Sequence, residues 1–199
     1  MQPDNFTIVI LAAGNSSRLG KPKQLLTYNN TILIGHEVQT AADSGCNEVV
    51  VVTGANHDQV ATAISSEDVV VVENRNWQTG MASSVKAGVE FAMEGQSKGV
   101  LIMLCDQPLI TSDHLKKLAS TFTTNPDKIV ATQYESVKGV PALFPERYFD
   151  KLTTLRGDQG ARQLIADNGE DVIAIAFEGA ALDIDTESDY RQLINLTSS

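Results

Sequence analysis

The sequence has 199 residues and is acidic, with 25 Asp and Glu residues against 15 Lys and Arg residues and a formal net charge of −10. A hydrophobic content of 42% suits one globular domain and excludes disordered and fibrous classes. The negative charge argues against nucleic acid and membrane surfaces as partners, because both are anionic. The apolar runs are all far shorter than the roughly 20 residues that cross a bilayer.

The N-terminal segment gives no sign of a secretory signal. Its short apolar run has no basic residue before it, whereas Arg18 and Lys21 follow it. Cys46 and Cys105 form neither a close metal pair nor a disulfide framework. We therefore expect a reduced, cytoplasmic protein.

Apolar runs rich in β-branched residues alternate with stretches of helical period along the whole chain. This alternation predicts an α/β fold with a mostly parallel, twisted sheet and helices on both faces. In chain order, we expect strands at residues 7–13, 48–53, 69–73, 99–105, 128–133, 141–144, 172–177 and 182–185. Helices are expected around residues 34–41, 85–92, 115–122 and 156–167, and from Thr186, whose hydroxyl can cap a helix.

A loop rich in small and basic residues, 14–23, follows the first predicted strand. Its amides, hydroxyls and cations, Arg18 among them, suit phosphate groups. A P-loop is excluded, because the spacing from Gly14 to Gly20 is one residue too long and Pro22 replaces the magnesium-binding hydroxyl. The dinucleotide fingerprint G-x-G-x-x-G is also absent. A solvated basic turn is the structural alternative.

A second segment, residues 74–88, follows the third predicted strand and opens a helix. Gly80 permits a tight turn, and the free amides after it favour an anion. Ser83 and Ser84 lie in no G-x-S-x-G motif, so a serine nucleophile is not expected. In the alternative interpretation, the serines only cap the helix and Trp77 packs in the core.

Carboxylates stand at the carboxyl ends of predicted strands, where open α/β sheets bind ligands. Asp106 follows one strand, and Asp185 closes another with Asp183 two residues earlier, on the same side. Magnesium commonly binds one or two carboxylates together with phosphate oxygens. We therefore expect Asp106 and Asp185 to be metal ligands, with Asp183 as the alternative to Asp185. Asp106 could instead cap a helix that starts near Thr111.

The motifs together resemble a known family. Residues 11–23, LAAGNSSRLGKPK, are similar to the nucleotidyltransferase signature L-A-A-G-x-S-x-R-[ML]-G-x-x-K. With residues 74–88, 105–108, 139–141, 156–162 and 183–186, the chain resembles the molybdenum cofactor cytidylyltransferases of the MobA-like branch. Guanylyltransferase relatives typically carry L-A-G-G where this chain has LAAG, which favours a cytosine nucleotide.

The resemblance implies a single Rossmann-like nucleotidyltransferase domain over residues 1–199, with a nucleotide half at about 1–110 and an acceptor half at about 111–199. It implies transfer of CMP from CTP to the phosphate of molybdopterin, with Mg²⁺ as cofactor and pyrophosphate as leaving group. The nucleotide-binding residues would be Leu11, Ala12, Ala13, Gly14, Ser16, Ser17, Arg18, Lys23, Gly80 and Ser84, and the acceptor-binding residues Gly139, Pro141 and Arg162. A client molybdoenzyme and a monomeric or weakly homo-oligomeric state are further expectations.

The implied reaction needs no general base, because a phosphate monoester is already largely a dianion at neutral pH. Catalysis then depends on counter-charge, so Arg18 and Lys23 are the expected catalytic residues. None of the three histidines is expected to act, since they lie on separate predicted elements. Two alternatives are open: a related transferase that uses GTP or another small phosphate acceptor, and a protein that binds nucleotide or cofactor without chemistry. Residues 156–162 could also be an ordinary helix start capped by Asp158.

Overall fold

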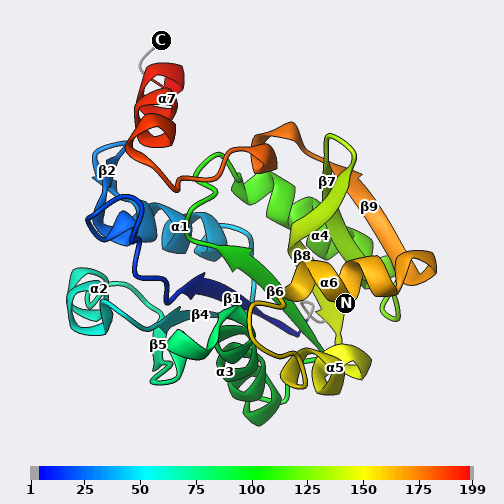
Figure 1. Ribbon diagram of the computed structural model, residues 1–199. Helices are drawn as coiled ribbons and strands as arrows, with labels where there is room; N and C mark the ends of the chain where they lie inside the picture. The colour runs from blue at the N-terminus through cyan, green and yellow to red at the C-terminus, as the bar shows by residue number, and fades with distance from the viewer. Residues whose placement is uncertain (1–4, 198–199) are drawn as a thin grey trace.

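A seven-stranded sheet runs through the computed structural model, which describes residues 5–197 (Figure 1). The strands are β1 (Phe6–Ala12), β4 (Glu48–Thr53), β5 (Val70–Glu73), β6 (Gly99–Leu104), β7 (Ile129–Tyr134), β8 (Val137–Pro145) and β9 (Val172–Ala176). They lie in the order β5-β4-β1-β6-β8-β7-β9. Neighbouring strands pair in parallel except at β8, which is antiparallel to both β6 and β7. The predicted mostly parallel sheet is thereby confirmed.

Helices bury both faces of the sheet. One face is covered by α1 (Leu33–Ala42), α2 (His57–Ala63) and α4 (Ser112–Thr124), and the other by α3 (Met81–Glu94), α5 (Phe149–Thr153) and α6 (Ala161–Asp167). Alternate residues of β1 supply the two cores, Ile8 and Ile10 on the first face and Val9 and Leu11 on the second. This two-sided burial explains why the strands are continuous apolar runs in the sequence.

The C-terminal helix α7 (Glu187–Thr197) packs near a small hairpin of β2 (Thr27–Tyr28) and β3 (Thr31–Ile32), as Figure 1 shows. Thr186 caps it as predicted: its Oγ1 accepts a hydrogen bond from Asp189 N at 3.3 Å, and the Asp189 carboxylate accepts one from Thr186 N at 2.7 Å. Tyr190 adds a hydrogen bond from its hydroxyl to Thr27 O at 2.7 Å. Short 3₁₀ segments occupy Lys23–Leu25, Trp77–Thr79, Glu146–Tyr148, Gly169–Asp171 and Glu178–Ala181.

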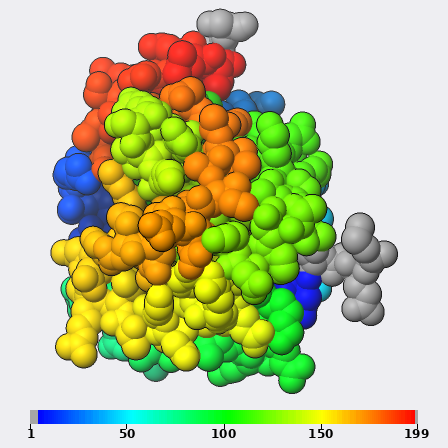
Figure 2. Space-filling view, turned by 90° about the vertical axis from the view of Figure 1, so that its right-hand side faces the viewer, coloured from blue at the N-terminus to red at the C-terminus, as the bar shows by residue number. Residues whose placement is uncertain are grey.

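One predicted strand is wrong, and one predicted helix begins later than expected. Residues 182–185 form no strand; Ile184 is buried and donates its N–H to Asp106 O at 2.9 Å. The helix predicted at 156–167 starts only at Ala161, because Gly157 has a left-handed backbone with φ of 58°. Figure 2 views the molecule from the side on which β9, α6 and the β7–β8 hairpin lie at the surface.

Cys46 and Cys105 are free thiols, Cys46 partly buried and Cys105 buried at the end of β6. Burial raises the pKa of the Cys105 thiol, so the residue stays protonated at neutral pH. Across residues 5–197, no helix has both the length and the apolar sequence needed to cross a membrane.

Candidate active site

The basic loop leaves the end of β1 and is held in place by its own side chains. Ser16 accepts a hydrogen bond at its Oγ from Lys23 N at 3.0 Å. Gln24 is fully buried and donates its Nε2 to Ala12 O at 2.8 Å and to Gly14 O at 2.9 Å. These bonds fix the loop to the strand end and set the position of Lys23. The sequence analysis did not predict a role for Gln24. Its position next to Lys23 is the signal that could have suggested one.

Lys23 lies between two carboxylates. Its Nζ contacts Asp106 Oδ2 and donates to Asp185 Oδ1 at 3.1 Å. Arg18 extends the chain of charges, with Nη2 at 2.8 Å from Asp185 Oδ2. The structure therefore brings together all four residues for which sequence reasoning expected a shared charge cluster.

The charges within this cluster differ in their exposure. The side chains of Lys23 and Asp106 are 13% and 15% exposed, whereas that of Arg18 is 70% exposed. Burial opposes the charge on Lys23, but Asp106 and Asp185 outweigh it and raise the pKa of Lys23 above its usual value. Lys23 is thus a buried, fixed cation, whereas Arg18 is an exposed cation that pairs with Asp185 alone among the acidic side chains described.

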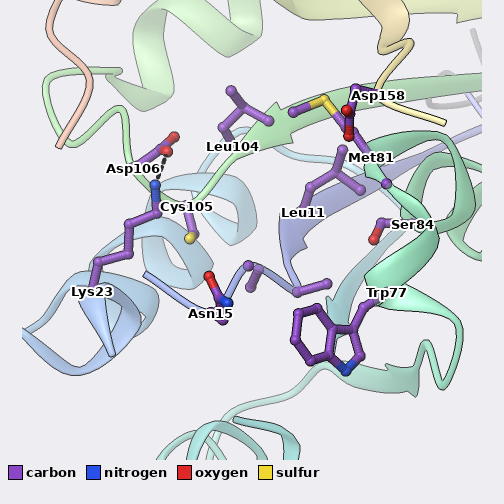
Figure 3. A pocket seen from close by; sticks show the side chains of 14 residues that line it. Leu11, Asn15, Lys23, Trp77, Met81, Ser84, Leu104, Cys105, Asp106 and Asp158 are labelled. Atoms are coloured by element: carbon purple, nitrogen blue, oxygen red, sulfur yellow. Dashed lines mark hydrogen bonds and ion pairs between the residues drawn. The ribbon is translucent and has the colours of Figure 1, made fainter. Parts of the chain in front are cut away.

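A cavity of about 320 Å³ opens beside this cluster (Figure 3). Lys23 and Asp106 stand on one side of it, with Trp77 and Ser84 opposite. Trp77 is half-buried and forms a wall of the cavity, so it is not simply a core residue. The lining residues are Leu11, Ala12, Ala13, Gly14, Asn15, Lys23, Trp77, Gly80, Met81, Ser84, Leu104, Cys105, Asp106 and Asp158.

A second cavity, of about 190 Å³, continues the first along the basic loop. Its walls are Gly14, Asn15, Ser16, Ser17, Arg18, Lys23 and Asp185, of which Gly14, Asn15 and Lys23 also line the first. Every residue predicted to bind nucleotide lines one of these two cavities. The predicted set of site residues did not include six of the wall residues: Asn15, Trp77, Met81, Leu104, Cys105 and Asp158.

The wall around Ser84 is organised by Asn74. Asn74 is 5% exposed and donates its Nδ2 to Ser83 Oγ at 2.8 Å and to Ser84 Oγ at 3.0 Å. Its Oδ1 accepts from Asn76 N at 2.9 Å, which closes the turn after β5. Asn74 therefore orients both serines.

Gly80 joins this wall to the segment before α6. It has a φ of 109°, and a Cβ there would lie 2.2 Å from Gly157 O. The same Gly157 O accepts a hydrogen bond from Ala82 N at 3.0 Å. Only glycine fits this close approach, which brings residues of the predicted acceptor half against the first cavity.

A third cavity, of about 150 Å³, shares Leu11, Met81 and Leu104 with the first. Asp183 lines this cavity, whereas Asp185 contacts Arg18 and Lys23. The expectation that both carboxylates point to one side of a strand is therefore wrong, because residues 182–185 form no strand. Burial, followed by the charges of Asp106 and Asp185, raises the pKa of Asp183 to about 6.

Of the three predicted acceptor residues, one lines the third cavity and two lie behind its wall. Arg162 lines the third cavity, but Gly139 and Pro141 flank Val140, which lines it instead. Gly139 lies beneath Tyr134, where a Cβ would be 2.8 Å from the phenol oxygen. Pro141 O accepts a hydrogen bond from the Thr132 hydroxyl at 2.6 Å. Gly139 and Pro141 therefore support the wall of the third cavity without lining it.

The carboxylates fit a divalent cation that arrives with a phosphate ligand. Asp106 Oδ1 is buried and has no hydrogen-bond partner in the described chain. Carboxylate and phosphate oxygens are the ligands that magnesium and manganese accept. Within residues 5–197, no group of three His, Cys, Asp or Glu side chains could hold a metal. Phosphate oxygens would thus have to complete the coordination around Asp106 and Asp185.

The fold and the site are those of a nucleotidyltransferase: a basic loop, buried and exposed cations and paired carboxylates meet at the carboxyl ends of parallel strands. Residues 8–172 match the MobA-like NTP transferase domain, and the chain belongs to that family.

Similar proteins cover nearly the whole chain. Nicotine blue oxidoreductase of Paenarthrobacter nicotinovorans is 33% identical, over 94% of this chain and 96% of its own. Purine catabolism protein PucB of Bacillus subtilis is 28% identical, over 92% of each chain. The crystal structure of Rv0371c from Mycobacterium tuberculosis superimposes with a TM-score of 0.80 at 32% identity, covering 96% and 98% of the two chains. A manganese complex of Rv0371c gives a TM-score of 0.78 over the same shares, at 28% identity.

Proposed function

We propose that this protein transfers CMP from CTP to the phosphate of molybdopterin and releases pyrophosphate. The observation that carries the proposal is the continuous chain of charges from Arg18 through Asp185 and Lys23 to Asp106, which lines the first and second cavities. The sequence LAAG at residues 11–14 supports cytosine over guanine, by resemblance to the cytidylyltransferases.

In this reaction an acceptor phosphate oxygen attacks the α-phosphorus, and the bond from that phosphorus to the β-phosphate oxygen breaks. The base and ribose would lie in the cavity between Trp77 and Lys23, with the triphosphate along residues 14–18. Arg18 and Lys23 would offset the repulsion between the two anions and the charge on pyrophosphate. Asp106 and Asp185 would hold Mg²⁺, which neutralises phosphate charge when bound.

Residues 1–110 would supply most of the nucleotide site and residues 111–199 most of the acceptor site. The division is not strict, because Asp158 lines the nucleotide cavity and Leu11 lines the third cavity. The third cavity meets the first at Leu11, Met81 and Leu104, so an acceptor bound there would reach the reaction centre past these side chains. The alternatives in the same class are GTP as donor and another small phosphate as acceptor.

Transfer from each of four α-labelled NTPs to purified molybdopterin tests the proposal. We expect labelled dinucleotide and pyrophosphate with CTP and Mg²⁺, and little product with GTP. Labelled product from GTP and not from CTP would show that GTP is the donor. Tight binding of CTP without release of pyrophosphate would favour a protein that binds the nucleotide but catalyses no transfer. An NADH oxidation assay belongs beside it, because one similar protein is named an oxidoreductase. The missing dinucleotide fingerprint predicts no oxidation.

A further inference from the structure

The sheet opens between β6 and β8 at the position of the third cavity. β8 pairs with β6 only as far as the pair Ile102 and Ala142, although β6 continues to Leu104. Beyond Ala142, β8 goes on pairing with β7. Ile102 and Leu104 of β6, together with Val140 of β8, line the third cavity. The cavity therefore lies where these two strands separate.

A bulge in β8 marks the point of separation. In the ladder with β7, Thr132 faces Gly139, whereas the residue before Thr132 faces Ala142. Val140 and Pro141 lie between these two partners and stand outside the ladder. Bulges bend a strand and redirect its side chains, often beside functional sites. Here one of the two bulged residues, Val140, lines the third cavity.

Two buried side chains hold this bulge. The hydroxyl of Thr132, which is fully buried, donates to Pro141 O at 2.6 Å. A threonine hydroxyl has one proton, so the same oxygen accepts a hydrogen bond from His114 Nε2, which lies 2.8 Å away. Burial lowers the pKa of His114 to about 4, and the ring is therefore neutral at pH 7 with its proton on Nε2.

His114 is itself fixed from two further sides. Its backbone N–H donates to Oγ1 of Thr111, the residue that caps α4, at 3.2 Å. Its ring stacks on Phe177, with 4.4 Å between the ring centroids and 25° between the planes. Phe177 directly follows β9. The hydrogen-bond chain from His114 through Thr132 to Pro141 thus ties the bulge to α4 and to the end of β9.

We propose that Thr132 and His114 are positioning residues for the acceptor, because they hold the bulge at Val140 and Pro141 that shapes the third cavity. This inference rests on the proposed function, since it takes the third cavity as the acceptor site. Neither Thr132 nor His114 is among the described residues that line the cavity, so both act through the bulge. Loss of the Thr132 hydroxyl would leave Pro141 O and His114 Nε2 buried without the partners they now have, which favours another arrangement of the bulge.

Long-range ¹H–¹⁵N NMR of the histidine rings tests the hydrogen-bond chain in the native protein, with His114→Gln to assign the signal. We expect a neutral His114 ring at pH 7 with its proton on Nε2. A proton on Nδ1 alone would overturn the inference, because Thr132 would then donate its proton to His114 and not to Pro141 O.

Steady-state kinetics of Thr132→Val and Thr132→Ser test the positioning role. We expect Thr132→Val to raise the KM for molybdopterin at least about 10-fold, with a change in the KM for CTP below about twofold. Thr132→Ser keeps the hydroxyl and should stay within about threefold of the native KM for molybdopterin. Thr7→Val is the matched control: Thr7 is 1% exposed, its Oγ1 lies 2.6 Å from Ser97 Oγ, and it stands near the start of β1, at the other end of the sheet. It should leave both KM values unchanged.

Methyl NMR of Val140 observes the cavity wall without any transfer reaction. Thr132→Val should shift the Val140 methyl signals, whereas Thr132→Ser and Thr7→Val should leave them in place. Shifted signals together with no product from the native protein would refute the proposed reaction and support the role of Thr132 in shaping the cavity. Unmoved Val140 signals, or an unchanged KM for molybdopterin in an active Thr132→Val protein, would overturn the inference. If thermal unfolding shows that Thr132→Val does not fold, His114→Phe, which removes the donor and keeps a ring on Phe177, should shift the same signals.

Discussion

Replacement of Lys23 by methionine removes one charge and keeps the apolar stem of the side chain. In the native protein Lys23 Nζ bridges Asp106 and Asp185, and these two carboxylates have no other cation of comparable burial among the described residues. In the Lys23→Met variant the carboxylates of Asp106 and Asp185 lose the cation between them. The substitution should therefore lower both the stability of the folded state and the rate of transfer.

The two effects have different sizes. Loss of one preorganised charge at a phosphoryl centre lowers turnover by about 10²- to 10³-fold, which corresponds to about 2.7 to 4 kcal/mol. Breaking a fully buried ion pair costs about 3 to 5 kcal/mol, but Asp185 is 37% exposed, so we expect about 1 to 2 kcal/mol in the free energy of unfolding.

Pyrophosphate release with CTP, Mg²⁺ and molybdopterin measures turnover, and urea unfolding measures stability. The double variant Lys23→Met, Asp106→Asn is the matched control, because it removes the orphaned charge along with the cation. It should recover stability but not activity. Near-normal turnover in a folded Lys23→Met protein would refute the role of Lys23 in charge neutralisation.

Three further predictions concern other parts of the structure. Gly80→Ala should lower the free energy of unfolding by about 2 to 4 kcal/mol, because the new Cβ meets Gly157 O at φ 109°; an unchanged urea midpoint would contradict this. Asn74→Ala should raise the KM for CTP about 10-fold with a smaller change in kcat, by freeing Ser84, and steady-state kinetics with equal effects on both would argue against that positioning role. Burial lowers the pKa of His114 to about 4, so the unfolded chain takes up a proton below pH 6.5 while the folded chain does not. Stability should fall by about 3 kcal/mol between pH 6.5 and 4, and His114→Gln should flatten that part of a urea-unfolding pH profile; an unchanged profile would exclude His114 as the cause.

The strands of the central sheet were predictable because burial on both faces leaves a continuous β-branched run. Residues 48–53 match β4 in full for that reason. The strand predicted at residues 182–185 is wrong because an alternating apolar and acidic pattern also suits an extended segment outside the sheet that buries one side chain. Here Ile184 enters the core between the hairpin and α7, and its N–H bonds to a loop, not to a strand.

The charge cluster was predictable because carboxyl ends of neighbouring strands converge, which places Asp106 near the loop after β1. Gln24 and Asn74 were not, since their roles depend on hydrogen bonds to groups that only the folded chain brings near. The choice between Asp183 and Asp185 likewise needed the path of an irregular segment.

The central claim is that cations and carboxylates from distant parts of the chain form one site for a nucleoside triphosphate and a divalent metal. A crystal structure with α,β-methylene CTP and Mn²⁺ tests it most directly, because manganese gives an anomalous signal. The account predicts a single anomalous peak between Asp106, Asp185 and the triphosphate, with the phosphates along residues 14–18. A triphosphate bound away from Arg18 and Lys23, or a metal bound away from Asp106, would contradict it.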